Sequence, residues 1–134
     1  MIEQPHTHST NRANQAERWV YNIPDLWRAA EHLPIMITYP THLPEFHFLM
    51  DTSVANIWWS RQQGTTGSFT MKEMITHTQQ ILDADLDFPI ILNPEGGIMD
   101  GIHRVLKAVL LGKTIKVQRF EEWPEPTTKE SYNG

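Results

Sequence analysis

Apolar residues recur at helical spacing in the stretch that follows Thr70. Thr70 and Glu73 form a capping box, in which each side chain satisfies a backbone N–H of the other residue, and such a box is typical of a helix start. The pattern therefore predicts a helix that begins directly after Thr70 and ends near the acidic run at 83–87. His77 and Gln79 are predicted to face away from its apolar stripe. That single stripe consists of Met71, Met74, Ile75, Ile81 and Leu82.

A second helical pattern directly follows the pair Asp100-Gly101. Because Ile98-Met99 before this pair is apolar, the order predicts a strand, a tight turn and the first turn of a helix. Asp100 is suited to be the N-cap of that helix, and Gly101 permits a close approach of the backbone to a ligand. Gly112 ends the pattern, whose apolar positions are Ile102, Val105, Leu106, Val109 and Leu110.

Short β-rich runs, separated by proline and glycine turns, surround these two helices. Asn22 or Pro24-Asp25 opens a further short helix, since proline is accepted in the first turn of a helix. The glycines of 93–97 favour a tight turn, and 41–47 is expected to be a loop. This combination predicts an α+β fold with a small mixed β-sheet and helices packed on it. The predicted strands are 19–21, 35–39, 88–92, 98–99 and 115–120.

The two ends of the chain differ from its middle in composition. Residues 1–16 are polar and are predicted to form a flexible arm, residues 17–120 form a single domain, and residues 121–134 form an acidic, proline-containing tail. Neither the histidine-containing arm nor the tandem pair Trp58-Trp59, in a stretch of helical spacing, receives a role from the sequence.

Composition restricts the chemistry that is open to this chain. It has no cysteine, which excludes disulfides, thiolate metal ligands and cysteine nucleophiles and suits a reducing compartment. No run approaches the roughly 20 apolar residues of a membrane span, and the N-terminus lacks the basic and apolar regions of a signal peptide. We therefore expect a cytoplasmic protein that does not bind a membrane.

The overall charge is acidic, but it is unevenly distributed. A net charge of −5 and a pI of about 5.7 argue against specific binding to duplex DNA, because duplex affinity depends on clustered Lys and Arg. Residues 97–119 nevertheless carry five bases against the one acid Asp100, a local sum of +4. Arg104 and Lys107 lie one helical turn apart and are able to act together, whereas the later lysines are expected to be solvated.

The first turn of the helix after Gly101 is the strongest candidate binding site. The free N–H groups and partial positive charge of a helix N-terminus attract phosphate or carboxylate. The N–H groups from Ile102 onward would cradle phosphates, Arg104 would bind them bidentately, and Lys107 would add charge. His103 would donate a hydrogen bond to a phosphate or orient a substrate. The competing interpretation is a plain capped turn with a solvated Arg104.

Three residues are candidates for catalysis, namely Asp100, His103 and Glu45. Asp100 would hold a metal ion, whose identity the sequence leaves unknown, or accept a hydroxyl proton. Glu45 would act as a general base, because a developing alkoxide requires a nearby proton acceptor. Glu95 is the alternative base, and the competing interpretation of Glu45 is an exposed loop acid.

The order of elements and the residues at this turn resemble the ParB/sulfiredoxin superfamily. The similarity covers about residues 35–120 and centres on Gly97-Ile98-Met99-Asp100-Gly101-Ile102-His103-Arg104. The resemblance implies an α+β domain that binds a nucleotide (ATP, ADP or CTP) at the Gly-x-x-Arg helix, with Mg²⁺ as an optional second cofactor. Further matching segments are 88–92, Lys107-Ala108, Leu111-Gly112 and Ile115-Lys116-Val117.

Three departures from the superfamily narrow the expected function. Sulfiredoxins carry a cysteine where this chain has Ile102, so their thiol chemistry is absent. The sequence does not continue into the helix-turn-helix of segregation proteins, so centromere binding is unsupported, and no two-carboxylate cluster supports a nuclease. Free serine kinases, which share the pattern Asp-Gly-x-His-Arg, are the nearest comparison.

Two functions from different classes stay open. The first is an enzyme, a small-molecule kinase or nucleotide hydrolase that transfers a phosphoryl group to a small acceptor or to water. The second is a non-catalytic accessory module, related to chromosome-partitioning proteins, that binds a nucleotide or a protein. The sequence does not determine the nucleotide, the acceptor or the oligomeric state.

Overall fold

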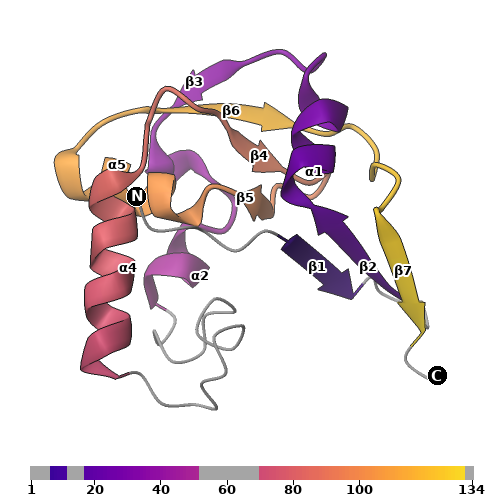
Figure 1. Cartoon of the computed structure of the whole chain (residues 1–134). Coiled ribbons are helices and arrows are strands. Elements are labelled where there is room, and N and C mark those ends of the chain that lie inside the picture. Colours follow the sequence, from indigo (N-terminus) through magenta and orange to yellow (C-terminus); the bar gives the residue numbers. More distant parts are fainter. Residues whose placement is uncertain (1–6, 12–16, 52–69, 132–134) are drawn as a thin grey trace.

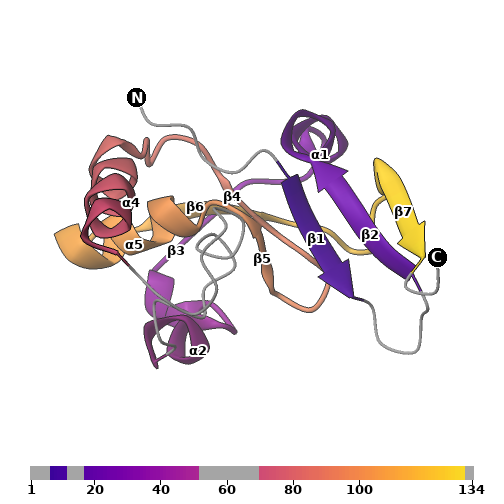
Figure 2. The ribbon, with the colours of Figure 1, turned by 60° about the horizontal axis from the view of Figure 1, so that its bottom comes forward.

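The computed structural model describes residues 7–11, 17–51 and 70–131. These residues form an α+β fold with two small β-sheets, and the first helix lies between the sheets (Figures 1 and 2). The predicted α+β class is confirmed, whereas two sheets take the place of the single expected sheet. The helical pattern around Trp58-Trp59 lies outside the described residues. Within them, no helix has the length and apolar character needed to cross a membrane.

The larger sheet has four strands: β3 (Met36–Thr38), β4 (Ile90–Leu92), β5 (Ile98–Asp100) and β6 (Ile115–Arg119). Their spatial order is β3-β6-β4-β5. β4 and β6 run parallel, whereas β3 with β6 and β4 with β5 are antiparallel, so the sheet is mixed as predicted. The four strands that the sequence predicts in this region are confirmed, with ends that differ by no more than two residues.

The second sheet contains β1 (Thr7–Asn11), β2 (Glu17–Asn22) and β7 (Thr128–Ser131), which pair antiparallel in that order. β2 confirms the strand predicted at 19–21. The predicted arm and tail are corrected, because each contributes a strand that pairs with β2. Both strands are polar, so only their pairing marks them as β-structure: β1 pairs with the next strand along the chain, and β7 with a strand more than 100 residues away.

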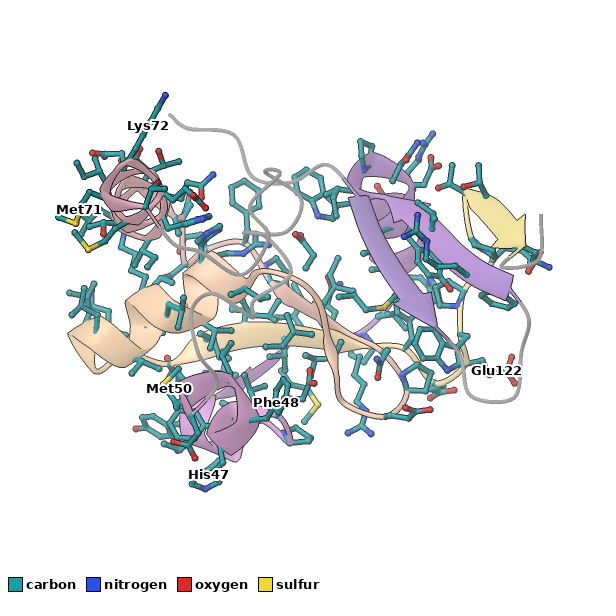
Figure 3. The ribbon with its side chains drawn as sticks, turned by 90° about the horizontal axis from the view of Figure 1, so that it is seen from below. His47, Phe48, Met50, Met71, Lys72 and Glu122 are labelled. Carbon is teal, nitrogen blue, oxygen red and sulfur yellow. The ribbon has the colours of Figure 1, made fainter. Side chains whose placement is uncertain are left out.

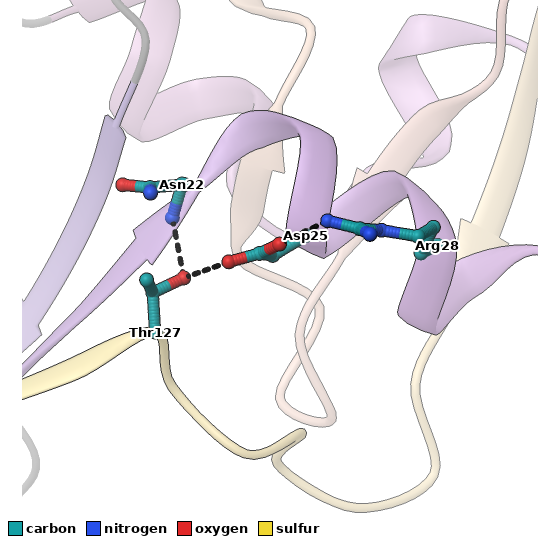
Figure 4. A network of polar contacts seen from close by, with 4 residues as sticks. All are labelled: Asn22, Asp25, Arg28 and Thr127. Carbon is teal, nitrogen blue, oxygen red and sulfur yellow. Dashed lines mark hydrogen bonds and ion pairs between the residues drawn. The ribbon is translucent and has the colours of Figure 1, made fainter.

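The C-terminal segment is also tied to the first helix, α1 (Ile23–Ala30), which begins after Asn22. The side-chain oxygen of Thr127 accepts a hydrogen bond from the backbone N–H of Asn22 (2.9 Å) and donates one to Oδ2 of Asp25 (2.7 Å). Arg28 pairs with the other carboxylate oxygen of Asp25 (Figure 4). Thr127 therefore ties the segment before β7 to the start of α1. The side chain of the N-cap residue Asn22 makes no capping hydrogen bond there.

The other helical segments are the 3₁₀ turn η1 (Pro40–His42), α2 (Phe46–Asp51), α4 (Met71–Asp83) and α5 (Ile102–Leu111). Both predicted long helices are confirmed. Both hydrogen bonds of the predicted capping box are present between Thr70 and Glu73. The loop predicted at 41–47 is wrong in part, because η1 and the first residues of α2 occupy it.

The apolar stripe of α4 is not the buried face of this helix. Its apolar residues are largely exposed, and Met71 projects with Lys72 from the outer side of the first turn (Figure 3). His77 and Gln80 are instead the buried residues, with exposed fractions of 3% and 2%. An apolar stripe normally marks the buried face of a helix, but here α4 packs against a histidine of α5.

Apolar residues pack on both faces of the four-stranded sheet. On one face, Val105 and Ala108 of α5 join Leu43, Ile90 and Leu92, with further residues of β6. The opposite face packs against α1, and this second cluster reaches β2 of the smaller sheet. Its buried members are Tyr21, Leu26, Ala30, Ile91, Met99 and Phe120. α1 therefore holds the two sheets together.

Two glycines of left-handed conformation offer a test of the turn that starts α5. Gly101 has a φ of +112°, and a Cβ there would lie 2.8 Å from Cδ1 of Ile90 and 3.1 Å from Nε of Arg104. Gly112, at the other end of α5, has a φ of +68° and nothing within 4 Å of a Cβ. We expect Gly112→Ala to lower the free energy of unfolding by about 1–2 kcal/mol. Gly101→Ala should cost roughly 1–3 kcal/mol more, because neighbouring atoms must move.

Urea unfolding of both variants measures this difference. Equal losses would contradict the close packing around Gly101.

Candidate functional site

The predicted strand, turn and helix form the centre of the site. β5 ends at Asp100, the chain turns at Gly101, and α5 begins at Ile102. Asp100 is not the N-cap, however. Gly101 holds that position in a left-handed conformation, and no side chain caps the helix. The turn takes place one residue later than predicted, because Asp100 still belongs to the strand and its carboxylate is used elsewhere.

A buried ion pair joins β5 to α5. Nη2 of Arg104 donates to Oδ2 of Asp100 at 2.8 Å, and each side chain is 7% exposed. The indole Nε1 of Trp27, on α1, donates to the same Oδ2 at 2.8 Å. Burying a single charge is costly, so each partner requires the other. The expectation that Arg104 is solvated if it binds no ligand is therefore wrong.

The guanidinium of Arg104 retains one unsatisfied donor. Its Nε is buried and has no hydrogen-bond partner among the described residues. A buried donor without a partner is uncommon in native structures and requires an explanation. An acceptor atom supplied by a ligand is one such explanation.

His103 lies on the other side of α5 and stacks on His77 of α4, with ring centroids 5.9 Å apart and ring planes 20° apart. Burial, together with the nearby charges of His77 and Arg104, lowers the pKa of His103 to about 3. Burial also lowers the pKa of His77, although its hydrogen bond to Gln80 opposes this shift. His103 is therefore neutral at pH 7 and adds no positive charge to the site.

The other predicted site residues, Lys107, Glu45 and Glu95, do not line up with Asp100 and Arg104 in one site. The ammonium of Lys107 donates to the carbonyl oxygens of Leu82 and Ala84, at 2.8 and 2.7 Å, and so caps the C-terminal end of α4. Oε1 of Glu45 accepts the backbone N–H of Ile98 at 2.7 Å. Glu95 is exposed in the turn between β4 and β5. The structure thus brings together Asp100, Gly101 and Arg104. Lys107 and Glu45 instead make hydrogen bonds to backbone groups of other segments.

A pocket of about 290 Å³ opens beside Arg104. Trp27 of α1 and Phe88, just before β4, line it with nearly parallel rings, whose planes differ by 6° and whose centroids lie 6.4 Å apart. Its other lining residues are Glu31, Pro89, Ile91 and Gln118. The pocket therefore combines an aromatic pair, a buried cation and two further polar side chains.

Sequence reasoning did not assign Trp27, Phe88, Glu31 or Gln118 to a site. Trp27 and Asp100 are 73 positions apart in the sequence, and no spacing rule relates residues at that distance. The only available signal is a tryptophan on a short helix, and that is more often a core residue.

In comparisons with known proteins, no family model, curated protein or solved structure matches this chain. The chemistry of the site therefore has to be inferred from its own geometry. Within residues 7–11, 17–51 and 70–131, no group of three or more His, Asp or Glu side chains is placed to hold a metal ion.

The buried ion pair makes a direct prediction about stability. Arg104→Met leaves the Asp100 carboxylate buried without its cation, and we expect a loss of about 3–5 kcal/mol in the free energy of unfolding. The double variant Asp100→Leu/Arg104→Met should recover part of this loss. Arg28→Met is the matched control, because the Asp25–Arg28 pair is exposed and should be worth at most about 1 kcal/mol.

Urea unfolding of the wild type, of the single variants Asp100→Leu and Arg104→Met, and of the double variant measures the coupling between Asp100 and Arg104. Additive losses in the double variant would contradict a pair that is stabilised mutually.

The low pKa of His103 predicts acid sensitivity. Its pKa is about 3 in the folded chain, against 6.5 for an unperturbed histidine, so the unfolded chain binds the extra proton between these values. Stability is therefore retained above pH 6.5 and lost as the pH falls toward 3, with a slope of at most about 1.4 kcal/mol per pH unit from this group. His103→Phe should flatten the pH dependence over this interval, as measured by urea unfolding from pH 7 to pH 4.

His32→Phe, at an exposed position, controls for the loss of a surface histidine. A slope in His103→Phe as steep as in the wild type would be evidence against this origin of acid sensitivity.

Proposed function

We propose that this chain binds a nucleotide in the pocket between α1, β4 and α5. One observation carries the proposal: the guanidinium of Arg104 and the parallel rings of Trp27 and Phe88 line the same pocket. A nucleotide has the two matching chemical parts, a planar base and an anionic phosphate chain. The pocket volume of about 290 Å³ lies close to the lower end of the range for small-molecule sites.

The aromatic pair is suited to the base. Trp27 and Phe88 are 48% and 54% exposed, so a ligand has access to their faces. Their ring planes differ by only 6°, and the exposed face of either ring provides a surface on which a base can stack.

The start of α5 is suited to the phosphates. The first N–H groups of a helix have no partner within it and favour an anion, and the unsatisfied Nε of Arg104 lies in the same turn. The resemblance to the ParB/sulfiredoxin superfamily adds ATP, ADP and CTP as the nucleotides to test. Mg²⁺, if it accompanies the phosphates, would be held mainly by the phosphates and water, because the Asp100 carboxylate is buried and already accepts hydrogen bonds from Arg104 and Trp27.

Binding without catalysis is the better supported function. Two of the groups that a phosphoryl transfer would need, Lys107 and Glu45, already make hydrogen bonds that hold α4 and the β4–β5 turn. His103 is buried and neutral. A kinase or hydrolase would have to release these contacts. We therefore favour the accessory nucleotide-binding module, and a nucleotide hydrolysis assay distinguishes it from the enzyme.

Isothermal titration with ATP, ADP and CTP, with and without Mg²⁺, tests the binding. Phe88→Ala should weaken the affinity by about tenfold, because stacking of one base on an aromatic ring contributes about 1–3 kcal/mol. Its thermal unfolding without ligand should stay close to that of the wild type, since Phe88 is half-exposed.

Phe48→Ala is the matched control. Phe48 is 70% exposed on α2 and does not line the pocket (Figure 3), so its loss should leave the affinity unchanged. The proposal fails if no nucleotide binds at millimolar concentration, or if both variants weaken binding equally.

A further inference from the structure

Two sides of the pocket carry polar groups of opposite character: the side formed by α5 offers hydrogen-bond donors, and the side near the end of α1 offers acceptors. Arg104, in the first turn of α5, is a pure donor. Glu31 and Gln118 lie instead near the C-terminal end of α1: Glu31 is the C-cap residue, and Gln118 of β6 contacts the carbonyl groups of Ala30, the last residue of α1, and of Leu33, just after it. A helix C-terminus carries a partial negative charge. The α1 side of the pocket is thus electronegative, and the α5 side is electropositive.

The hydrogen bonds of Gln118 determine what this side chain offers a ligand. Its Nε2 donates to the carbonyl oxygens of Ala30 and Leu33, both at 3.0 Å. An amide nitrogen has two hydrogens, so both donors are used. Only the carbonyl oxygen Oε1 is left for the pocket. Gln118 is 8% exposed, and its two bonds to the end of α1 hold the amide in this orientation.

The carboxylate of Glu31 is a second hydrogen-bond acceptor on this side of the pocket. An ionised carboxylate accepts hydrogen bonds and donates none. Both polar groups on the α1 side therefore require hydrogens from the ligand. A ligand that presents a carbonyl oxygen at this point would bring lone pairs against lone pairs and leave the buried Oε1 of Gln118 unpaired, which disfavours binding.

We infer that the α1 side of the pocket selects bases that carry an exocyclic amino group, as adenine and cytosine do, over bases with a carbonyl in that place. This inference rests on the proposed nucleotide binding. The amino hydrogens are donated to the Glu31 carboxylate and to Oε1 of Gln118. The ring stacks on Trp27 and Phe88, and the phosphates extend toward Arg104. Glu31 and Gln118 are specificity residues, because they act on the base rather than on the phosphates.

Matched pairs of nucleotides test this edge of the base. ATP and inosine triphosphate share their sugar and phosphates, but the amino group of adenine and its neighbouring acceptor nitrogen are replaced by a carbonyl and an N–H. CTP and UTP differ in the same way in the pyrimidine. Isothermal titration of the wild-type chain should give at least about tenfold tighter binding to the amino-bearing member of each pair that binds. This corresponds to the loss of about one hydrogen bond to a charged group.

Glu31→Gln tests the assignment to this residue, because the amide can donate a hydrogen bond to a carbonyl. The variant should reduce the preference for the amino-bearing nucleotides severalfold. Glu95→Gln is the matched control: Glu95 is also exposed but lies in the β4–β5 turn and does not line the pocket. It should retain the wild-type preference, and circular dichroism of both variants should match that of the wild type.

The possible failures of the two proposals are distinct. If none of the four nucleotides binds, the proposed function fails, and this inference fails with it. If inosine triphosphate and UTP bind as tightly as ATP and CTP, nucleotide binding stands and the selection is overturned. A preference that persists unchanged in Glu31→Gln overturns the role of Glu31.

Discussion

The buried ion pair between Asp100 and Arg104 is the interaction on which the centre of the molecule depends. It joins the last residue of β5 to the first turn of α5, and the indole of Trp27 adds α1 on the opposite face of the sheet. Neither charge is tolerated alone in such a place. Strand, turn and both helices are therefore held in one arrangement, and the arginine that lines the pocket is fixed in position before any ligand arrives.

The same interaction limits how a ligand binds. Asp100 neutralises Arg104, His103 is uncharged, and Lys107 is occupied at the end of α4. The local excess of bases in the sequence does not translate into a strong positive field at the pocket. If the proposed nucleotide binds, its affinity would have to come from directed hydrogen bonds, those of the helix N-terminus and of Nε of Arg104, together with stacking on the aromatic pair. Such a site would discriminate by geometry more than by charge.

Long-range pairing explains where sequence reasoning stopped. β7 and Thr127 stand more than 100 residues from the strand and helix that they contact, and their polar sequence has neither alternation nor periodicity. The orientation of α4 has a similar origin. An apolar stripe normally faces the core, but α4 contacts α5 through a histidine and a lysine of that helix. His77 stacks on His103, and the carbonyl groups at the end of α4 accept hydrogen bonds from Lys107, so most of the apolar stripe stays exposed.

The sequence by itself determined the features that depend on residues a few positions apart. These are the capping box at Thr70, the end of α5 at Gly112, the strand–turn–helix around Gly101 and the α+β class. Only the tertiary structure decided that Asp100 pairs with Arg104 instead of capping α5, that Lys107 serves α4, and that Trp27, Phe88, Glu31 and Gln118 share a pocket. The reason is physical: caps and turns follow from local backbone geometry, whereas the cost of burying a charge or an unsatisfied donor is set by neighbours that the chain brings together from distant segments.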